Sequence, residues 1–237
     1  MVSIVERMTN RKATDLDSEH LQDDNFILPG SAGEHSLQKQ YGTSKRAEKF
    51  YSNQVLDHLN EEMRRFISRM EIMFVSTADK SGKCDCTIRC GLPGFIIPLD
   101  EHTVIYPEYR GNGVMASLGN ISENPHIGLL LVDFFSSAIG LHINGTAEII
   151  ENDLLLELEC VPGGVRAAME ETGGRKPERW VCTKVEEAYI HCSKHIPMLK
   201  PMSKEITWGT DDEKLKGGDF FGVKRGNLKS RKIRGQR

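Results

Sequence analysis

The sequence lacks any apolar run long enough to cross a membrane, and its charge is close to balanced. No stretch approaches the roughly 18 consecutive apolar residues that mark a transmembrane helix. Residues 1–20 have no apolar region of the signal-peptide type, so we expect a cytoplasmic protein. The formal net charge of the 237 residues is −3, which gives no overall attraction to nucleic acid. These absences favour an ordinary globular domain.

The apolar residues are also scarce at the two ends of the chain. The hydrophobic fraction of 38% is low for a chain that is ordered throughout. We predict a flexible polar N-terminus over residues 1–33, a folded domain over 34–200 and a basic tail over 201–237. Such a tail is typical of a solvated end, and nucleic-acid binding by it is the less favoured alternative.

The six cysteines lack the spacing of a zinc site. The segment CDCTIRC, residues 84–90, has no C-x-x-C pair, and no second pair mirrors it, so we expect no metal site. In a strand, alternation places Cys84, Cys86, Ile88 and Cys90 on one face and Arg89 on the other. Free cysteine behaves as a small buried hydrophobe. We therefore predict that the thiol face packs in the core and that Arg89 points away from it.

Hydrophobic periodicity predicts one helix followed by many short strands. Apolar residues recur at three- and four-residue steps from Val55 to Met70, which indicates an amphipathic helix. The period then becomes two, and we predict strands over IMFVSTA, CDCTIRC and AIGLHINGTAEII, with GFIIPLD, TVIYPEY and RWVCTKVEEAYIHC as further strands. IGLLLVDF is a continuous apolar run, which predicts a strand buried on both sides. Short strands with short connections favour a mainly β antiparallel barrel over a doubly wound sheet.

Three further segments complete the predicted organisation. Residues 36–54 contain scattered aromatic side chains and are predicted to wrap over the folded body. LLLELEC, residues 154–160, is a helix candidate, and residues 162–177 read as loop with at most one helical turn.

The stretch YPEYRGNGVMASLGNISENPHIGLLLVDF, residues 106–134, is the richest in chemically informative residues. GNGVMA satisfies the dinucleotide fingerprint in its G-x-G-x-x-A form. A Rossmann unit needs a helix long enough to cross a parallel sheet, yet only residues 112–123 are available before Pro125. Pro107 also interrupts the incoming strand. An NAD(P)-binding Rossmann protein is therefore a disfavoured alternative.

The same loop suits a phosphate group. Gly111 and Gly113 let backbone amides approach an anion, and a helix beginning near Asn112 or Gly113 presents unpaired N–H groups. Arg110 adds a permanently charged planar donor. The cradle would be completed by Arg89 from a neighbouring strand, with Ser117 and Asn120 from one helix face. The alternative is a plain turn with surface arginines.

With these segments in order, the chain resembles the pyridoxamine 5'-phosphate oxidase-like, FMN-binding split-barrel proteins over residues 34–197. The resemblance rests on GEHSLQKQYGTSKRAEKFY, VLDHLNEEMRRFI, FVSTADKSGKCDCTIRCGLPGF, VIYPEYRGNGVMASLGNISENPHIGLLLVDF, INGTAEI and EEAYIHCSKHIP. It implies a mainly β fold with flanking helices, a six-stranded antiparallel split β-barrel with an N-terminal helical extension. It also implies a homodimer with FMN at the subunit interface.

The resemblance further implies which residues contact the cofactor. Arg89, Arg110 and Asn112 would hold the FMN phosphate, and the segment from Gly91 to Phe95 would flank the isoalloxazine ring. The full set of predicted cofactor-binding residues is Arg89, Gly91, Gly94, Phe95, Tyr106, Pro107, Tyr109, Arg110, Gly111, Asn112, Gly113, Ser117 and Asn120.

Departures from the family argue against oxidation of the vitamin phosphate itself. The chain lacks the family's C-terminal R-x-H element, and Gly140 and His142 stand where the ring-binding strand carries glutamine and arginine. RGNG replaces serine-arginine-lysine in the phosphate loop. His142, His191 and Lys194 are possible pocket residues, whereas metal binding by His191 and His195 is disfavoured.

We therefore expect a flavin-dependent oxidoreductase that transfers hydride through flavin N5 to or from an unassigned substrate, with no catalytic residue identified. Three alternatives stay open at this level: a split-barrel protein that binds the deazaflavin F420, one that binds haem, and a flavin-binding module without turnover.

Overall fold

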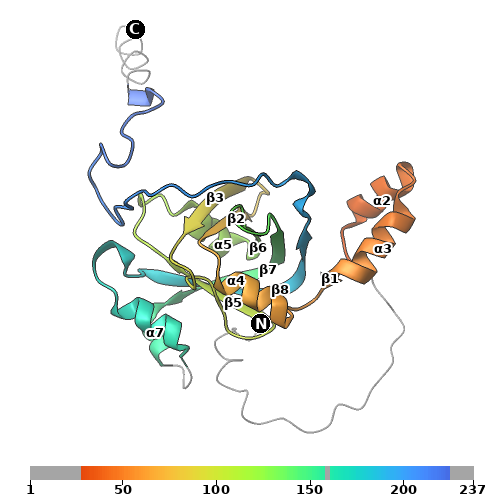
Figure 1. The fold of residues 1–237 in the computed structure, drawn as a ribbon, viewed down its shortest axis with the longest axis horizontal. Coiled ribbons are helices and arrows are strands. Elements are labelled where there is room, and N and C mark those ends of the chain that lie inside the picture. The colour runs from red at the N-terminus through yellow and green to blue at the C-terminus, as the bar shows by residue number, and fades with distance from the viewer. Residues whose placement is uncertain (1–27, 158–160, 225–237) are drawn as a thin grey trace.

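Eight antiparallel strands form one sheet that curves into a split barrel in the computed structural model, which describes residues 28–157 and 161–224 (Figure 1). The strand order is β3-β2-β6-β7-β8-β5-β4, and β1 pairs with β8. The long strands are β2 (Ile72–Ala78), β3 (Cys84–Cys90), β5 (Thr103–Glu108), β6 (His126–Val132), β7 (Gly140–Glu151) and β8 (Arg179–His191). The other two, β1 (Val55–Leu56) and β4 (Ile97–Pro98), are two residues long. The predicted mainly β, six-stranded split barrel is confirmed in its six long strands.

The apolar core consists of two clusters on the two sides of the sheet's β5–β8 region. The larger cluster contains fully buried Met73, Leu131 and Ile143, where period-two alternation points side chains from β2, β6 and β7 to one interior. The smaller cluster surrounds fully buried Trp180, whose Nε1 donates to Asn152 Oδ1 at 3.0 Å. Helices α6 (Asn152–Leu156) and α7 (Gly163–Glu170) contribute to this second cluster.

Helix α7 corrects the prediction for residues 162–177. Eight residues, and not one turn, are helical, and a 3-10 turn, η1 (Gly173–Arg175), follows. The two glycines at the start of α7 favour a loop in a sequence-based prediction. The segment is nevertheless helical, and its Val165 is fully buried in the smaller cluster. Of the helix candidate at 154–160, residues 154–156 belong to α6, and residues 158–160 lie outside the described residues.

Helix α4 (Glu61–Ser68) begins six residues later than the apolar stripe from Val55 predicts. Val55 and Leu56 instead form β1, opposite Tyr189 and Ala188 of β8. The N-cap side chain of Asn60 accepts a hydrogen bond from Met63 N at 2.9 Å, which fixes the helix start. The apolar spacing continues through strand, turn and helix because all three face the same core, so periodicity alone could not locate the boundary.

Strand β3 exposes the face that was predicted to be buried. Cys84 and Cys86 are exposed, and the Ile88 side chain on the same face is 50% exposed. The predicted alternation is present, since Arg89 lies on the opposite face, but the assignment of the thiol face to the core is wrong. β3 is an edge strand. Alternation in its sequence separates two faces, but it does not tell which face packs against the rest of the chain.

The N-terminal segment folds as a helical hairpin that projects from the barrel. Helices α2 (Ala32–Gln40) and α3 (Ser44–Gln54) lie beside each other at the edge of the molecule (Figure 1). Ser31 and Glu34 form a capping box at the start of α2. Contact with the barrel includes the edge-to-face pair of Phe50 and Tyr189. The predicted helical extension is therefore present, but it does not wrap over the body.

The remaining predictions for the chain ends fall mostly outside the described residues. These include residues 1–27 of the predicted flexible N-terminus and 225–237 of the basic tail. Within the part that the structure describes, no helix combines the length and apolar character needed to span a bilayer.

The connection from β5 to β6 is not a Rossmann crossover. β5 and β6 are separated in the sheet by β7 and β8, and every recorded strand pairing is antiparallel. The nicotinamide-binding Rossmann alternative is therefore wrong. Pro107 does not interrupt its strand either, because β5 continues to Glu108 and pairs only with β8 beyond Ile105, where a missing N–H is tolerated.

We expect the Gly145→Ala variant to lose stability. Gly145 lies at the register shift between β7 and β8, where an added Cβ would sit 1.9 Å from the carbonyl oxygen of Lys184. Overpacking of this kind costs about 1–3 kcal/mol of unfolding free energy, measurable by urea denaturation. As a control, Gly119→Ala in a helix, where a Cβ meets nothing within 4 Å, should stabilise by up to about 1 kcal/mol. Unchanged stability of Gly145→Ala would contradict the close packing at the register shift.

Candidate functional site

A cleft of about 850 Å³ opens between β3, the loop that follows β5 and helix α5 (Ala116–Glu123). It is lined by residues 85–90 of β3, by residues 108–118, by Glu178 and Arg179, and by Trp208, Gly209 and Asp211 of the C-terminal segment. The sequence-predicted residues that line it are Arg89, the loop residues 109–113 and Ser117. The structure therefore brings together the two predicted arginines and the glycine loop.

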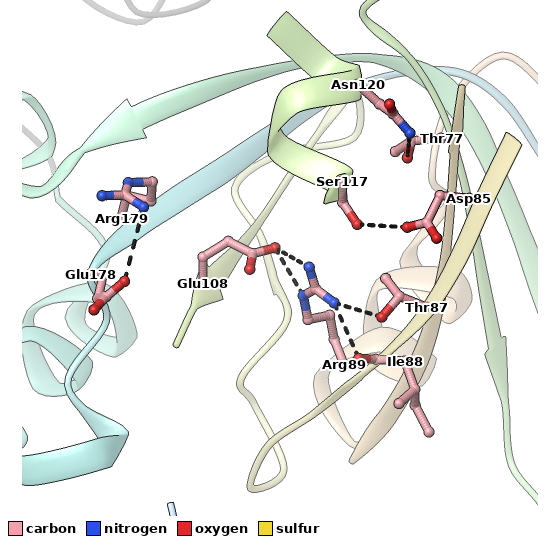
Figure 2. A network of polar contacts seen from close by, with 10 residues as sticks. All are labelled: Thr77, Asp85, Thr87, Ile88, Arg89, Glu108, Ser117, Asn120, Glu178 and Arg179. Atoms are coloured by element: carbon pink, nitrogen blue, oxygen red, sulfur yellow. Dashed lines mark hydrogen bonds and ion pairs between the residues drawn. The ribbon is translucent and has the colours of Figure 1, made fainter. Parts of the chain in front are cut away.

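Arg89 is held in place by Glu108 (Figure 2). Its Nε and Nη2 each lie 2.8 Å from Glu108 Oε1, and its Nη1 donates to Thr87 Oγ1 and to the Ile88 carbonyl oxygen, both at 3.2 Å. Burial raises the pKa of Glu108, and the neighbouring Arg89 offsets only part of that effect. The guanidinium keeps one of its five N–H groups free of these contacts.

Arg110 is more than half exposed and is paired with Asp211 of the C-terminal segment. Its Nη2 lies 2.5 Å from Asp211 Oδ2, and the two side chains are 57% and 65% exposed. An exposed ion pair of this kind contributes only about 0.2–1 kcal/mol, so the guanidinium is not fixed in this orientation.

The loop between β5 and α5 has the open backbone that an anion site requires. Asn112 Oδ1 accepts a hydrogen bond from Val114 N at 2.9 Å, and Gly113 adopts φ +78°, which favours glycine. A Cβ added at Gly111 or Gly113 would meet nothing within 4 Å, so a ligand can approach the main chain there. The helix itself starts at Ala116, after Met115 with φ 54°, and not near residue 112 or 113 as predicted.

Six other predicted cofactor residues lie outside the cleft lining. Phe95 is buried against Gly91, where an added Cβ would lie 2.3 Å from its ring, and Gly94 adjoins it in sequence. Tyr106 and Pro107 are buried in β5, and Asn120 donates to Thr77 Oγ1 at 3.0 Å. The Tyr106 hydroxyl is buried without a hydrogen-bond partner among the described residues, and burial raises its pKa.

The two histidines of the pocket hypothesis form their own cluster on β7 and β8. His142 stacks on Tyr189 with ring centroids 4.6 Å apart, and its Nε2 lies 2.9 Å from His191 Nδ1. Burial lowers the pKa of His142, and the neighbouring His191 lowers it further. Lys194 is exposed in the turn η2 (Ser193–His195). Neither they nor Cys192 lines the cleft, and the described residues contain no group of three or more potential metal ligands.

Sequence reasoning missed several residues of the cleft. Asp85 and Thr87 share the Arg89 face of β3, so the alternation that was recognised could have identified them. Ser117 Oγ lies 3.4 Å from Asp85 Oδ2 (Figure 2). No local signal pointed to the remaining members, which come from distant parts of the chain, among them Glu178, Arg179, Trp208 and Asp211.

One comparison with known proteins identifies a family. A sequence profile described as "Pyridoxamine 5'-phosphate oxidase" matches residues 59–192, more than half of the chain. A search among curated proteins gave no match.

Solved structures with the same type of fold are similar at low identity. HupZ from Group A Streptococcus is 24% identical over 54% of this chain and 89% of that chain, with a TM-score of 0.40. An FMN-binding protein from Syntrophomonas wolfei is 14% identical over 67% and 97%, with a TM-score of 0.41. HutZ from Vibrio cholerae, a haem storage protein, is 10% identical over 56% and 93%, with a TM-score of 0.37.

Removing Arg89 should destabilise the protein in a pH-dependent way. In Arg89→Met, the carboxyl group of Glu108 stays buried without its partner, so the unfolding free energy at pH 7 should fall by about 3 kcal/mol. The pKa of Glu108, already raised by burial, should rise further, because its positive neighbour is gone. Protonated Glu108 needs no cation, so the loss should shrink as the pH falls toward 5.

The double variant Arg89→Met, Glu108→Leu serves as the control, since it removes both charges. It should recover most of the stability, with little dependence on pH between 5 and 7, in urea denaturation at several pH values. A pH-independent loss in the single variant would show that the Glu108 charge is not the cause.

Proposed function

Since the chain belongs to the pyridoxamine 5'-phosphate oxidase family, we propose that it binds FMN in the cleft beside β3 and acts as a flavin-dependent oxidoreductase. The observation that carries this proposal is the cleft itself. Two arginines, Arg89 and Arg110, and the open glycine loop line one cavity of about 850 Å³, a size suited to a ligand with a phosphate at one end.

The residues of the cleft fit a phosphate-bearing cofactor in distinct ways. Arg110 is free to exchange an exposed carboxylate for a phosphate, and the main chain at residues 111–113 is open to a ligand. Arg89 is pre-oriented by Glu108 and Thr87, so a bond from its remaining N–H costs little reorganisation. FMN, when bound, supplies hydride transfer at its N5 atom. The protein supplies position and charge.

The chain's own residues argue against pyridoxamine phosphate as the substrate. Gly140 stands where the resemblance places a longer polar side chain, and an added Cβ there would lie 2.9 Å from the Cβ of His191. His191 and His142 fill this region of β7 and β8 with their own contact. The substrate is therefore one that does not need the family's glutamine, arginine and R-x-H contacts.

We also propose that a second copy of the chain covers the β3 side of the cleft. Four apolar side chains of the edge strand β3, of the segment after it and of the glycine loop are at least half exposed: Ile88, Leu92, Val114 and Met115. Exposed apolar side chains clustered in this way mark interaction surfaces. A homodimer with the cofactor near its interface accounts for both the patch and the openness of the cleft.

FMN binding is expected to depend on Arg110 through the phosphate alone. The Arg110→Ala variant should bind FMN roughly tenfold more weakly. A hydrogen bond to a charged group contributes about 1.5–3 kcal/mol, and the low end applies here because water solvates the exposed guanidinium when FMN is absent. Riboflavin, which has no phosphate, provides the matched ligand and should bind both proteins equally. Quenching of flavin fluorescence measures both affinities.

Absorption spectra after incubation with FMN, F420 and haem separate the proposal from its alternatives. Flavin bands that persist through gel filtration support FMN. Retention of F420 or haem, with no uptake of FMN, would replace it with one of the other cofactors. Bound FMN that is reduced by dithionite but is not turned over by any donor and acceptor pair would indicate a flavin-binding module.

The proposed dimer is tested by the Ile88→Lys variant. A lysine at this half-exposed position should convert a dimer into monomers, observed by analytical ultracentrifugation, because burying its charge in an apolar interface is unfavourable. Leu37→Lys, on the projecting helix α2, is the control and should leave the mass unchanged. A wild-type monomer at all concentrations would contradict the proposal.

A further inference from the structure

A segment near the C-terminus lies against the phosphate loop of the cleft. We refer to residues 204–216 as the C-terminal strap; in Figure 1 it forms part of the blue chain that runs along one side of the barrel. Residues of the strap line the large cleft together with Arg110, and they enclose a second cavity of about 300 Å³ with Arg110, Gly111 and Asn112. The strap therefore borders both cavities that the phosphate loop lines.

Three contacts hold the strap in this position. The Trp208 ring meets the edge of Tyr109 with centroids 5.3 Å apart. The backbone at Trp208 and Gly209 packs so closely on Gly174 that a Cβ added to Gly174 would lie 2.0 Å from the Trp208 carbonyl oxygen. Asp211 Oδ2 lies 2.5 Å from Arg110 Nη2.

The third contact places a carboxylate on the arginine that would bind phosphate. A carboxylate and a phosphate both accept hydrogen bonds from the same in-plane edge of a guanidinium, so the two compete for Arg110. Asp211 has Lys216 as a second positive neighbour, with Nζ 3.8 Å from Oδ1, so its charge stays balanced when it leaves Arg110. Both side chains of the pair are more than half exposed, which makes the exchange inexpensive.

We propose that Asp211, which the C-terminal strap holds on Arg110, competes with the phosphate group of the cofactor for this arginine. This inference rests on the proposed function of the cleft. It adds a regulatory element to it: ligand binding requires the strap to release Arg110, and a change that loosens the strap raises affinity. The strap thereby sets how much free cofactor the protein needs before it is loaded.

Two variants remove the competition by different routes. Asp211→Asn removes the carboxylate charge but keeps the side-chain shape, whereas Gly174→Ala leaves every charge in place and displaces the strap through the clash with Trp208. Each should bind FMN about two- to fivefold more tightly than the wild type, the range that an exposed ion pair contributes. Riboflavin affinity should not change in either variant. Isothermal titration at about 0.15 M salt measures these affinities.

Two matched controls separate this effect from general charge and from mutation of glycine. Asp212→Asn removes the same charge one residue away from the ion pair, where screening at this salt concentration weakens its influence. Gly163→Ala adds a Cβ that meets nothing within 4 Å. Both should bind FMN like the wild type.

Each outcome of the titration decides between the two proposals. If the wild type binds FMN and both Asp211→Asn and Gly174→Ala bind it equally or more weakly, the competitor role is wrong and the strap is neutral or part of the site. If neither the wild type nor any variant binds FMN, the proposed function is wrong. Tighter binding by Asp211→Asn and Asp212→Asn alike would reduce the effect to general charge and overturn the competitor role.

Limited trypsin digestion supplies a readout that does not depend on affinity. Cleavage after Lys204, Lys214 or Lys216, detected by mass spectrometry, reports whether the strap is released. FMN should accelerate this cleavage in the wild type, and Gly174→Ala should show fast cleavage without FMN. Protection of these sites by FMN would show that the strap closes on the ligand, which contradicts the proposal.

Discussion

The Arg89–Glu108 ion pair joins β3 and β5, two strands that are not neighbours in the sheet. β3 is the first strand in the sheet order and β5 is the last but one, so the two lie on opposite sides of the split. The side chains are 19% and 10% exposed, and removing such charges from water is unfavourable unless they are paired closely. The raised pKa of Glu108 reflects that cost. Arg89 and Glu108 both line the cleft, so the distance between its β3 and β5 sides depends on this ion pair.

The functional elements on either side of that pair differ in how firmly they are held. Arg89 has four contacts from β3 and β5, whereas Arg110 has exposed Asp211 as its ion-pair partner. The loop between them is open at Gly111 and Gly113. The cavity therefore combines the firmly held Arg89 with the loosely held Arg110 and the open glycine loop. Such a combination suits a ligand that one group orients and that other groups adjust to bind.

Much of the fold was predictable because its signals are local, while the site depends on contacts that are not. Period-two alternation in β2, β3 and β7 and the continuous apolar run of β6 indicated the barrel, and the ordered segments identified the family. The same alternation found the two faces of β3 but could not tell which one the chain covers, so the exposure of Cys84 and Cys86 was missed. Trp208 and Asp211 reach the cleft from about a hundred residues away, and nothing in their local sequence indicates this.

The charges of the cleft imply an order in which an anionic ligand engages it. Arg89, Arg110 and Arg179 each lie within 4 Å of a carboxylate, so a phosphate gains a contact only where it displaces or adds to an existing partner. Displacing exposed Asp211 forfeits about 0.2–1 kcal/mol. Displacing Glu108 would leave a buried charge unpaired, at a cost of about 3–5 kcal/mol. On the proposed function, a phosphate would therefore exchange with Asp211 at Arg110, while Arg89 stays on Glu108 and offers only its remaining N–H. That proposal assigns phosphate recognition to Arg110 and the closure of the barrel to Arg89, two arginines of the same cleft.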